Sequence, residues 1–192
     1  VRDVGKVIEK NNNGEAVRAL GVHMNKKKKK KIEKEIRYLS FHDELTGLYN
    51  RRYLNNELER LNNSRKRPIS IIIGDLDKLK IVNDNHGHLL GDQYLKEAAS
   101  ILKDTMRSED IVVRTGGDEF SIILPETDSN DAEKICERIR AGFNQVNQEQ
   151  ELPVEFSISL GIATLKDSEE DLAHYYNQAD KAMYKNKGRN TI

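Results

Sequence analysis

Residues 111–124, IVVRTGGDEFSIIL, place two short apolar runs on either side of a Gly-Gly-Asp-Glu turn. The runs at 111–115 and 120–124 have the length and β-branched content of buried strands, and the paired glycines suit a tight turn between them. The stretch therefore predicts a β-hairpin. Such a turn explains the glycines, but it does not explain why Asp118 and Glu119 follow them.

Helices and strands alternate on both sides of this hairpin. The order β-α-α-β-β-α-β-α predicts the α+β class, with a central, mostly antiparallel sheet and helices packed on one face of it, as in the palm domains of nucleotide-polymerising enzymes. Periodicity places further strands at 69–73 and 156–163, and helices at 51–61, 95–106, 132–146 and after a capping box formed by Ser168 and Asp171.

Charge is distributed unevenly along a chain whose formal net charge is zero. The 192 residues include 32 Lys and Arg and 32 Asp and Glu. Residues 26–37 carry +6 and residues 1–25 carry +1, so the remainder carries −7. The sequence thus joins a basic linker to an acidic domain, whose overall field repels anions.

The composition also bears on location. No apolar run reaches the roughly 18 residues that a membrane span needs, and no signal core follows the first charges. The single cysteine, Cys136, lies in the apolar stripe of an expected helix and allows no internal disulfide. We expect a cytoplasmic domain without membrane contact of its own, although the full-length protein could be tethered through segments outside this sequence.

Residues 1–25 are interpreted as the end of a sensor domain. Two strand-like segments flank an Asn/Gly turn at 11–14, and a lone hairpin is marginal in water, so the pair should complete a larger sheet. The string NGEAVRALGVHM resembles the last two strands of a PAS domain, with a disordered leader as the alternative. We expect a signalling helix at 26–42 and the main domain at 43–192.

The linker helix has a short apolar stripe. Ile32, Ile36 and Leu39 have the spacing of a two-helix seam. Because the stripe spans barely two heptads, dimerisation through it needs help from neighbouring domains. The adjacent lysine run is also compatible with nucleic acid or an acidic membrane surface, but aromatic residues are not interleaved with it. A solvated helix face is favoured, and we expect no nucleic-acid partner.

Two more polar clusters accompany the acidic pair of the hairpin. Asp75 and Asp77 follow the strand at 69–73, and residues two apart in a strand point to one face of a sheet. Hard oxygen ligands placed in this way suit Mg²⁺, and the hairpin carboxylates could meet them around a metal. Asn83 and Asp92 supply the donors and acceptors that match a guanine edge.

Together these motifs resemble the GGDEF domain of diguanylate cyclases. Residues 116–120 spell GGDEF, residues 43–52 (DELTGLYNRR) resemble the family's N-terminal motif, and residues 75–92 (DLDKLKIVNDNHGHLLGD) resemble its nucleotide-binding stretch. The resemblance covers residues 41–192. It implies a palm-like domain with surrounding helices that acts as a nucleotidyltransferase in bacterial second-messenger signalling. Two GTP molecules would condense into cyclic di-GMP and two pyrophosphates in a homodimer, with two Mg²⁺ or Mn²⁺ ions per active site.

The resemblance also implies roles for individual residues. Asp118 and Glu119 are the expected catalytic residues, while the role of Asp77 is interpreted as structural. The chain departs from the family pattern near its end, where Lys187 and Arg189 are two apart and cannot share a helical face as residues four apart do. The implied metal ligands are Asp75, the carbonyl of Leu76, Asp118 and Glu119, and the implied substrate contacts are Leu79, Lys80, Asn83, Asp92, Gly116, Gly117, Lys187 and Arg189.

A separate motif points to product binding. Arg107-Ser-Glu-Asp110 resembles the RxxD inhibitory site of many family members, and Arg138 lies where a second arginine often contributes. A guanidinium grips phosphate in two places, which suits a cyclic dinucleotide. An i,i+3 ion pair at a helix end is the alternative. The inhibitory site is favoured, so cyclic di-GMP is expected as product and feedback inhibitor.

Two other functions compete with the cyclase. One is a non-catalytic receptor for cyclic di-GMP or GTP. The intact Asp118 and Glu119 argue against it, whereas the shortened stretch near Lys187 keeps it open. The other is a palm-type enzyme making a hybrid purine dinucleotide, although Asp92 favours guanine over adenine. His86 and His88 are interpreted as neither metal ligands nor a general base, because no third soft ligand lies nearby in the sequence.

Overall fold

The computed structural model describes residues 2–24, 26–166 and 171–187. The chain divides into two compact units, Val1–Ser40 and Phe41–Ile192. In the first unit, β1 and β2 pair in an antiparallel hairpin, and α1 follows in the chain. These elements are β1 (Arg2–Lys10), β2 (Ala16–Met24) and α1 (Lys26–Phe41). The expected hairpin and linker helix are therefore present.

The hairpin turn and the stripe on α1 have the features that the sequence indicates. The Asn11 side chain accepts a hydrogen bond from the backbone N–H of Asn13 and so stabilises the turn. Ile32, Ile36 and Leu39 are 45%, 59% and 52% exposed. This exposure leaves the stripe open to a partner helix.

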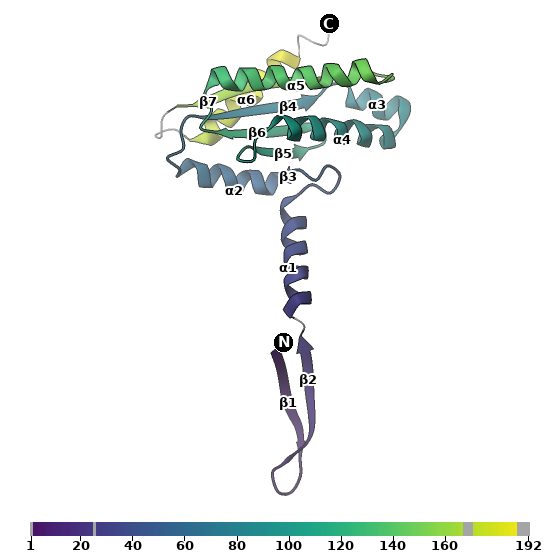
Figure 1. Ribbon diagram of the computed structural model, residues 1–192, viewed down its shortest axis with the longest axis vertical. Helices are drawn as coiled ribbons and strands as arrows, with labels where there is room; N and C mark the ends of the chain where they lie inside the picture. The colour runs from purple at the N-terminus through teal and green to yellow at the C-terminus, as the bar shows by residue number, and fades with distance from the viewer. Residues whose placement is uncertain (1, 25, 167–170, 188–192) are drawn as a thin grey trace. The chain divides into compact units, whose positions relative to one another are not determined.

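The second unit is built on a five-stranded sheet of order β3-β5-β6-β4-β7 (Figure 1). Neighbouring strands are antiparallel except β3 and β5, which run parallel. The predicted α+β class with a mostly antiparallel sheet is confirmed, and the element order from β4 onward is as expected. The strands are β3 (Tyr49–Asn50), β4 (Ile69–Leu76), β5 (Ile111–Gly116), β6 (Glu119–Pro125) and β7 (Ile158–Leu165).

Helices cover both faces of this sheet, so the expectation of helices on one face is wrong (Figure 1). The reason lies in β4, every residue of which is buried. Ile71 and Ile73 belong to the core under α2 and α6, whereas Ile72 belongs to the core under α3, α4 and α5. The helices are α2 (Arg51–Asn62), α3 (Leu79–His86), α4 (His88–Thr105), α5 (Ser129–Glu149) and α6 (Leu172–Lys187).

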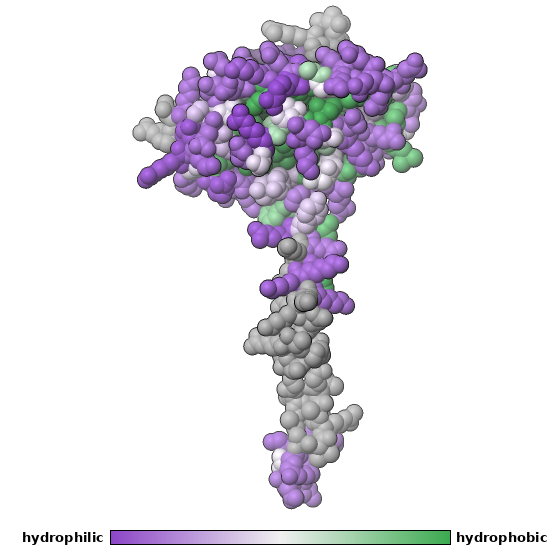
Figure 2. Space-filling model, viewed as in Figure 1, coloured by the Kyte–Doolittle hydropathy of each residue, from purple (hydrophilic) through white to green (hydrophobic). Residues whose placement is uncertain are grey.

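The surface of the second unit is mostly hydrophilic on the face drawn in Figure 2. Charged residues make up 33% of the sequence, which accounts for this covering. Among the helices described, none combines the length and the apolar character needed to cross a membrane.

Two smaller expectations concern Cys136 and the start of the last helix. Cys136 is 1% exposed on α5, and burial raises the pKa of its thiol to about 12, which confirms it as a core residue. At the start of α6, the Asp171 carboxylate accepts a hydrogen bond from the backbone N–H of Ala173. Ser168, the other half of the expected capping box, lies outside the described residues.

The contact between β7 and α6 depends on Gly161. A Cβ built at this position would collide with the backbone nitrogen of Met183 and the carbonyl oxygen of Ala179. Gly161→Ala should therefore force the helix away from the sheet and lower the free energy of unfolding by about 1–3 kcal/mol or more. A urea titration followed by circular dichroism measures the loss.

Gly74→Ala is the matched control for this prediction, because Gly74 also lies within the sheet. The nearest atoms to its Cβ would be the side-chain atoms Ile158 Cδ1 and Leu160 Cδ2, each at 3.0 Å, and side chains yield more easily than helix backbone. We expect the smaller loss from Gly74→Ala. Equal losses from the two variants would contradict the close packing of α6 backbone on β7.

Candidate functional site

The acidic clusters that the sequence places at strand ends come together at one end of the sheet. Asp75, near the end of β4, is the cross-strand partner of Glu119, the first residue of β6. The backbone N–H of Leu76 donates to the carbonyl oxygen of Asp118 at 3.0 Å, which ties the strand end to the hairpin turn. The two segments are far apart in sequence, and their antiparallel pairing is what places the carboxylates side by side.

Asp75 is a buried carboxylate with a lysine partner. By alternation along β4 it faces the same side as Ile73, the side covered by α6. The Nζ of Lys187, the last residue of α6, lies 2.7 Å from Asp75 Oδ1. The side chain of Asp75 is 5% exposed and that of Lys187 is 37% exposed.

The pKa values of this pair reflect burial and charge together. Burial raises the pKa of Asp75, and the charges of Asp118 and Asp77 raise it further, outweighing the contribution of Lys187. Burial acts to lower the pKa of Lys187, but its hydrogen bond to Asp75 and the surrounding carboxylates leave that pKa raised. The end of the sheet is therefore an electronegative site that favours a bound cation.

The donor set fits a divalent metal ion. Within the described part of the chain, no three His, Cys, Asp or Glu side chains group closely enough to hold a metal by themselves. Mg²⁺, however, binds through one or two carboxylates together with substrate phosphates. The carboxylates of Asp75 and Asp118 and the carbonyl of Leu76 are hard oxygen donors of that kind.

Asp77 has a different environment from Asp75. Its carboxylate accepts hydrogen bonds from the hydroxyls of Ser157 at 2.8 Å and Ser159 at 2.7 Å, and it is 8% exposed. These bonds connect the end of β4 to the segment that leads into β7. The arrangement agrees with the structural role inferred from the sequence.

The two predicted guanine contacts lie on neighbouring helices. Asn83 is on α3 and Asp92 is in the first turns of α4, and both are half-buried. A Cβ at Gly91 would collide with the Asn83 side-chain oxygen. Gly91 thus makes room for Asn83, a function that the sequence motif at 75–92 does not reveal. His86 and His88 are exposed at the junction of the two helices.

The remaining predicted substrate contacts differ in accessibility. Gly116 and Gly117 are exposed at the hairpin turn, and Gly117 has a φ of 27°, which favours glycine. Lys80 is exposed on α3, whereas Leu79 is 7% exposed and packs in the core. Arg189 lies outside the described residues.

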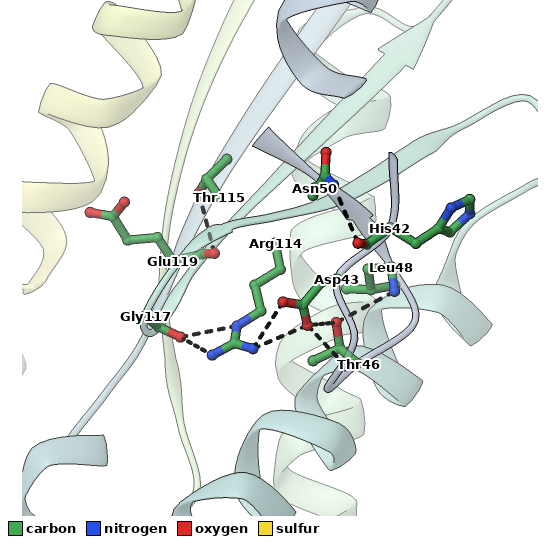
Figure 3. A network of polar contacts seen from close by, with 9 residues as sticks. All are labelled: His42, Asp43, Thr46, Leu48, Asn50, Arg114, Thr115, Gly117 and Glu119. Atoms are coloured by element: carbon green, nitrogen blue, oxygen red, sulfur yellow. Dashed lines mark hydrogen bonds and ion pairs between the residues drawn. The ribbon is translucent and has the colours of Figure 1, made fainter. Parts of the chain in front are cut away.

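A half-buried arginine, Arg114, links the hairpin turn to the start of the domain (Figure 3). Nε and Nη2 of Arg114 donate to the carbonyl oxygen of Gly117 at 3.1 Å and 2.8 Å, and Nη1 donates to Asp43 Oδ1 at 3.1 Å. Asp43 also accepts from the backbone N–H and the hydroxyl of Thr46. The side chain of Glu119 points away from this network (Figure 3).

The contacts of Arg114 affect both the pKa of Asp43 and the position of the hairpin turn. Burial alone would raise the pKa of Asp43, but hydrogen bonds from Thr46 and Arg114 outweigh it and hold the pKa below its ordinary value. The side chain of Arg114 is only 13% exposed. Sequence reasoning placed Asp43 in the motif at 43–52 but missed its contact with Arg114, because 71 residues separate the two and only the fold shows the contact.

Arg114→Ala should impair the site more than the fold. Without the two bonds to its carbonyl, Gly117 loses the support that sets the position of the turn, and a displacement of about 1 Å near reacting groups costs on the order of a hundredfold in rate. For the reaction that the sequence resemblance implies, we expect a fall of that size in kcat with a smaller change in KM. Steady-state kinetics with a thermal unfolding curve measures both effects.

Arg140→Ala is the matched control for this prediction, because Arg140 is an exposed arginine of α5. This variant should leave kcat unchanged. Asp43→Asn removes the charge that orients Arg114 and should lower kcat in the same direction. Unchanged kcat in Arg114→Ala would contradict the positioning role.

Two of the three predicted product-binding residues, Arg107 and Asp110, line a cavity of about 360 Å³. The Asp110 carboxylate accepts from the backbone N–H of Arg107 at 2.8 Å, and burial raises the pKa of Asp110. Arg138 donates from Nη2 to the carbonyl oxygen of Thr105, at the end of α4. Arg107 and Asp110 line the cavity together with Tyr49. The carboxylate of Asp110 thus bonds to the backbone of Arg107, and the side chain of Arg107 is exposed.

Comparison with known proteins identifies relatives for most of the chain. Residues 40–191 match the family described as diguanylate cyclase, GGDEF domain. The probable diguanylate cyclase DgcT of Escherichia coli is 34% identical over 160 residues, covering 80% of this chain and 35% of the relative. Diguanylate cyclase DosC of E. coli is 36% identical over 156 residues, covering 78% and 34%. The chain therefore spans about a third of the length of these two relatives.

Solved structures give the same result. The coiled coil and GGDEF domain of DgcB from Caulobacter crescentus, in complex with c-di-GMP, matches with a TM-score of 0.75 and 25% identity over 82% of this chain and 86% of that one. The GGDEF domain of PA1120 from Pseudomonas aeruginosa matches with a TM-score of 0.64 and 31% identity over 77% and 89%.

Proposed function

The chain belongs to the GGDEF domain family of diguanylate cyclases, and from this premise we propose that it condenses two GTP molecules into cyclic di-GMP and two pyrophosphates. The observation that carries the proposal is the convergence of Asp75, Asp118 and Glu119 at one end of the sheet. Acidic residues of two paired strands and of the turn between β5 and β6 are thus brought to one sheet end, beside glycines that are open to solvent. This is what phosphoryl transfer needs.

The proposal assigns a group of this chain to each step of the reaction. Asn83 and Asp92 bind the guanine edge, and the exposed backbone of Gly116 and Gly117 lets the triphosphate approach closely. Glu119 accepts the proton of the 3′-hydroxyl, whose oxygen attacks the α-phosphorus of the other nucleotide while pyrophosphate leaves. Asp75, Asp118 and the carbonyl of Leu76 would hold a divalent cation, which would offset negative charge on the phosphate oxygens. Lys187 and Arg189 bind the leaving phosphates.

The reaction requires two copies of the domain. One domain offers one guanine site, whereas the cyclic product contains two new phosphodiester bonds. Two domains must therefore face each other, each supplying one nucleotide. The exposed stripe of Ile32, Ile36 and Leu39 supports dimerisation through α1. We interpret the β1–β2 hairpin as the end of a PAS-like sensor that acts on this helix.

Cyclic di-GMP is the proposed feedback inhibitor. The exposed Arg107 and the neighbouring Arg138 offer two guanidinium groups beside the cavity that Asp110 lines. Arg107→Ala should weaken inhibition by about tenfold or more, since a hydrogen bond to a charged group contributes about 1.5–3 kcal/mol. The inhibition constant of cyclic di-GMP, measured from initial rates, tests this.

Lys103→Ala is the matched control for the feedback prediction, because Lys103 lines the same cavity but lies outside the proposed RxxD motif. We expect the uninhibited rate to be the same in both variants and in the wild-type chain. An inhibition constant unchanged by Arg107→Ala would contradict this site.

The experiment that tests the proposed function compares nucleotides. Purified chain is incubated with Mg²⁺ and either GTP or ATP, and cyclic dinucleotide and pyrophosphate are quantified. We expect product from GTP and none from ATP, because Asp92 accepts hydrogen bonds from guanine N1–H and the exocyclic amine, which adenine does not match. Equal turnover of both nucleotides, or tight cyclic di-GMP binding without any turnover, would contradict the proposal.

A further inference from the structure

Lys187 occupies a position that the proposed reaction assigns to a cation. Its Nζ lies 2.7 Å from Asp75 Oδ1, and Asp75 is the most buried carboxylate of the site, with 5% of its side chain exposed. A buried carboxylate is stable only with a nearby positive charge or hydrogen-bond donors. The ammonium group of Lys187 provides that charge.

An ammonium group and a divalent cation conflict at the same carboxylate. Both would approach Asp75 to within hydrogen-bond or coordination distance, and like charges a few Å apart repel strongly where water is largely excluded. Binding of the metal at Asp75 therefore requires Lys187 to withdraw. The conflict concerns charge and space and applies at any pH at which Asp75 is ionised.

The geometry of α6 allows the side chain to move while the helix stays. Asn186, the preceding residue, donates from Nδ2 to the carbonyl oxygen of Leu160 at 2.8 Å and so fixes the last turn of α6 on β7. Lysine carries its charge on a flexible four-carbon stem, and that of Lys187 is 37% exposed. Rotation about this stem can therefore carry the charge from Asp75 toward the open side of the site.

We propose that Lys187 stands in for the divalent cation at Asp75 in the empty site and transfers to the triphosphate when metal and nucleotide enter. The inference rests on the proposed function, which assigns Asp75 to the metal and the open site to GTP. The consequence is that nucleotide binding and metal binding are coupled. The nucleotide gives Lys187 a new partner, so that Asp75 becomes available to the metal. By thermodynamic reciprocity, each ligand then tightens the binding of the other.

Mn²⁺ binding without nucleotide provides the test. Free Mn²⁺ is titrated into the wild-type chain, Lys187→Gln and the control Lys185→Gln at pH 8, and the unbound ion is measured by electron paramagnetic resonance. Lys185 is an exposed lysine of the same helical turn. We expect Lys187→Gln to bind Mn²⁺ about tenfold more tightly than the other two chains. Equal or weaker binding by Lys187→Gln would overturn the proposal.

A non-hydrolysable GTP analogue gives the second half of the test. It should increase Mn²⁺ affinity by a larger factor in the wild-type chain than in Lys187→Gln, because only the wild-type lysine must be displaced. An equal increase in both chains would overturn the linkage. Asp75→Asn must abolish the tight Mn²⁺ site in every chain, and if it does not, the metal assignment fails as well. Product formation from GTP, measured separately, shows whether the proposed function stands when only the stand-in role fails.

Discussion

Asp118→Asn should lower the rate of cyclic di-GMP formation by about a hundredfold to a thousandfold. Asp118 lies in the hairpin turn, and its backbone carbonyl accepts a hydrogen bond from the N–H of Leu76. The carboxylate of Asp118 is close enough to Asp75 for its charge to raise the pKa of Asp75. Removing one charged ligand of a catalytic metal, or one group that stabilises charge in the transition state, typically costs about 3–4 kcal/mol in activation free energy. Product quantified by chromatography under saturating GTP and Mg²⁺ measures the loss.

Asp104→Asn is the control for this prediction, because Asp104 is an exposed carboxylate of α4. It should retain full activity, and both variants should keep the unfolding temperature of the wild-type chain. Glu119→Gln, at the cross-strand partner of Asp75, should lose activity in the same way as Asp118→Asn. Wild-type turnover in Asp118→Asn would exclude this end of the sheet as the reaction centre.

Removal of divalent cations should weaken GTP binding by about a hundredfold or more. Residues 38–192 carry a net charge of −7, and the nucleotide is itself highly anionic, so the overall field opposes binding. Asp75, Asp77 and Asp118 add negative charge at the site itself. Only local cations reverse this sign. Binding of a fluorescent GTP analogue, titrated with Mg²⁺ or with EDTA, measures the effect.

Guanosine is the control ligand for this prediction, because it has the same base and sugar as GTP but no phosphates. Its weaker binding through Asn83 and Asp92 should not change between Mg²⁺ and EDTA. If metal-free GTP bound as tightly as GTP with Mg²⁺, the electrostatic account of the site would be wrong. If guanosine lost affinity together with GTP, the metal would be acting on the fold and not on the phosphates.

Much of the fold could be predicted because its decisive segments are local. The apolar runs of β5 and β6 and the helical stripe of α5 each depend on residues a few positions apart, and the structure has them. The arrangement of helices was predicted wrongly, because periodicity within a helix does not say which face of the sheet it covers. The three successive isoleucines at 71–73 in β4 did carry that information, since apolar side chains at consecutive strand positions indicate a strand that is covered on both sides.

For the candidate site too, local features could be predicted from the sequence and contacts between distant residues could not. The acidic and glycine clusters could be named from the sequence, because strand ends concentrate polar groups. Their partners could not be named. The contact of Arg114 with Asp43 and that of Lys187 with Asp75 join residues 71 and 112 positions apart, and no local pattern connects them. The role of Gly91 likewise depends on how closely α3 and α4 approach.

The most direct measurement follows labelled GTP through the reaction in a sample shown by light scattering to be dimeric. We predict that, with Mg²⁺, every two GTP consumed yield one cyclic di-GMP and two pyrophosphates, and that the rate per chain falls as dilution separates the dimer. Absence of both products from a dimeric sample, or their formation at an undiminished rate per chain by a monomer, would contradict the account.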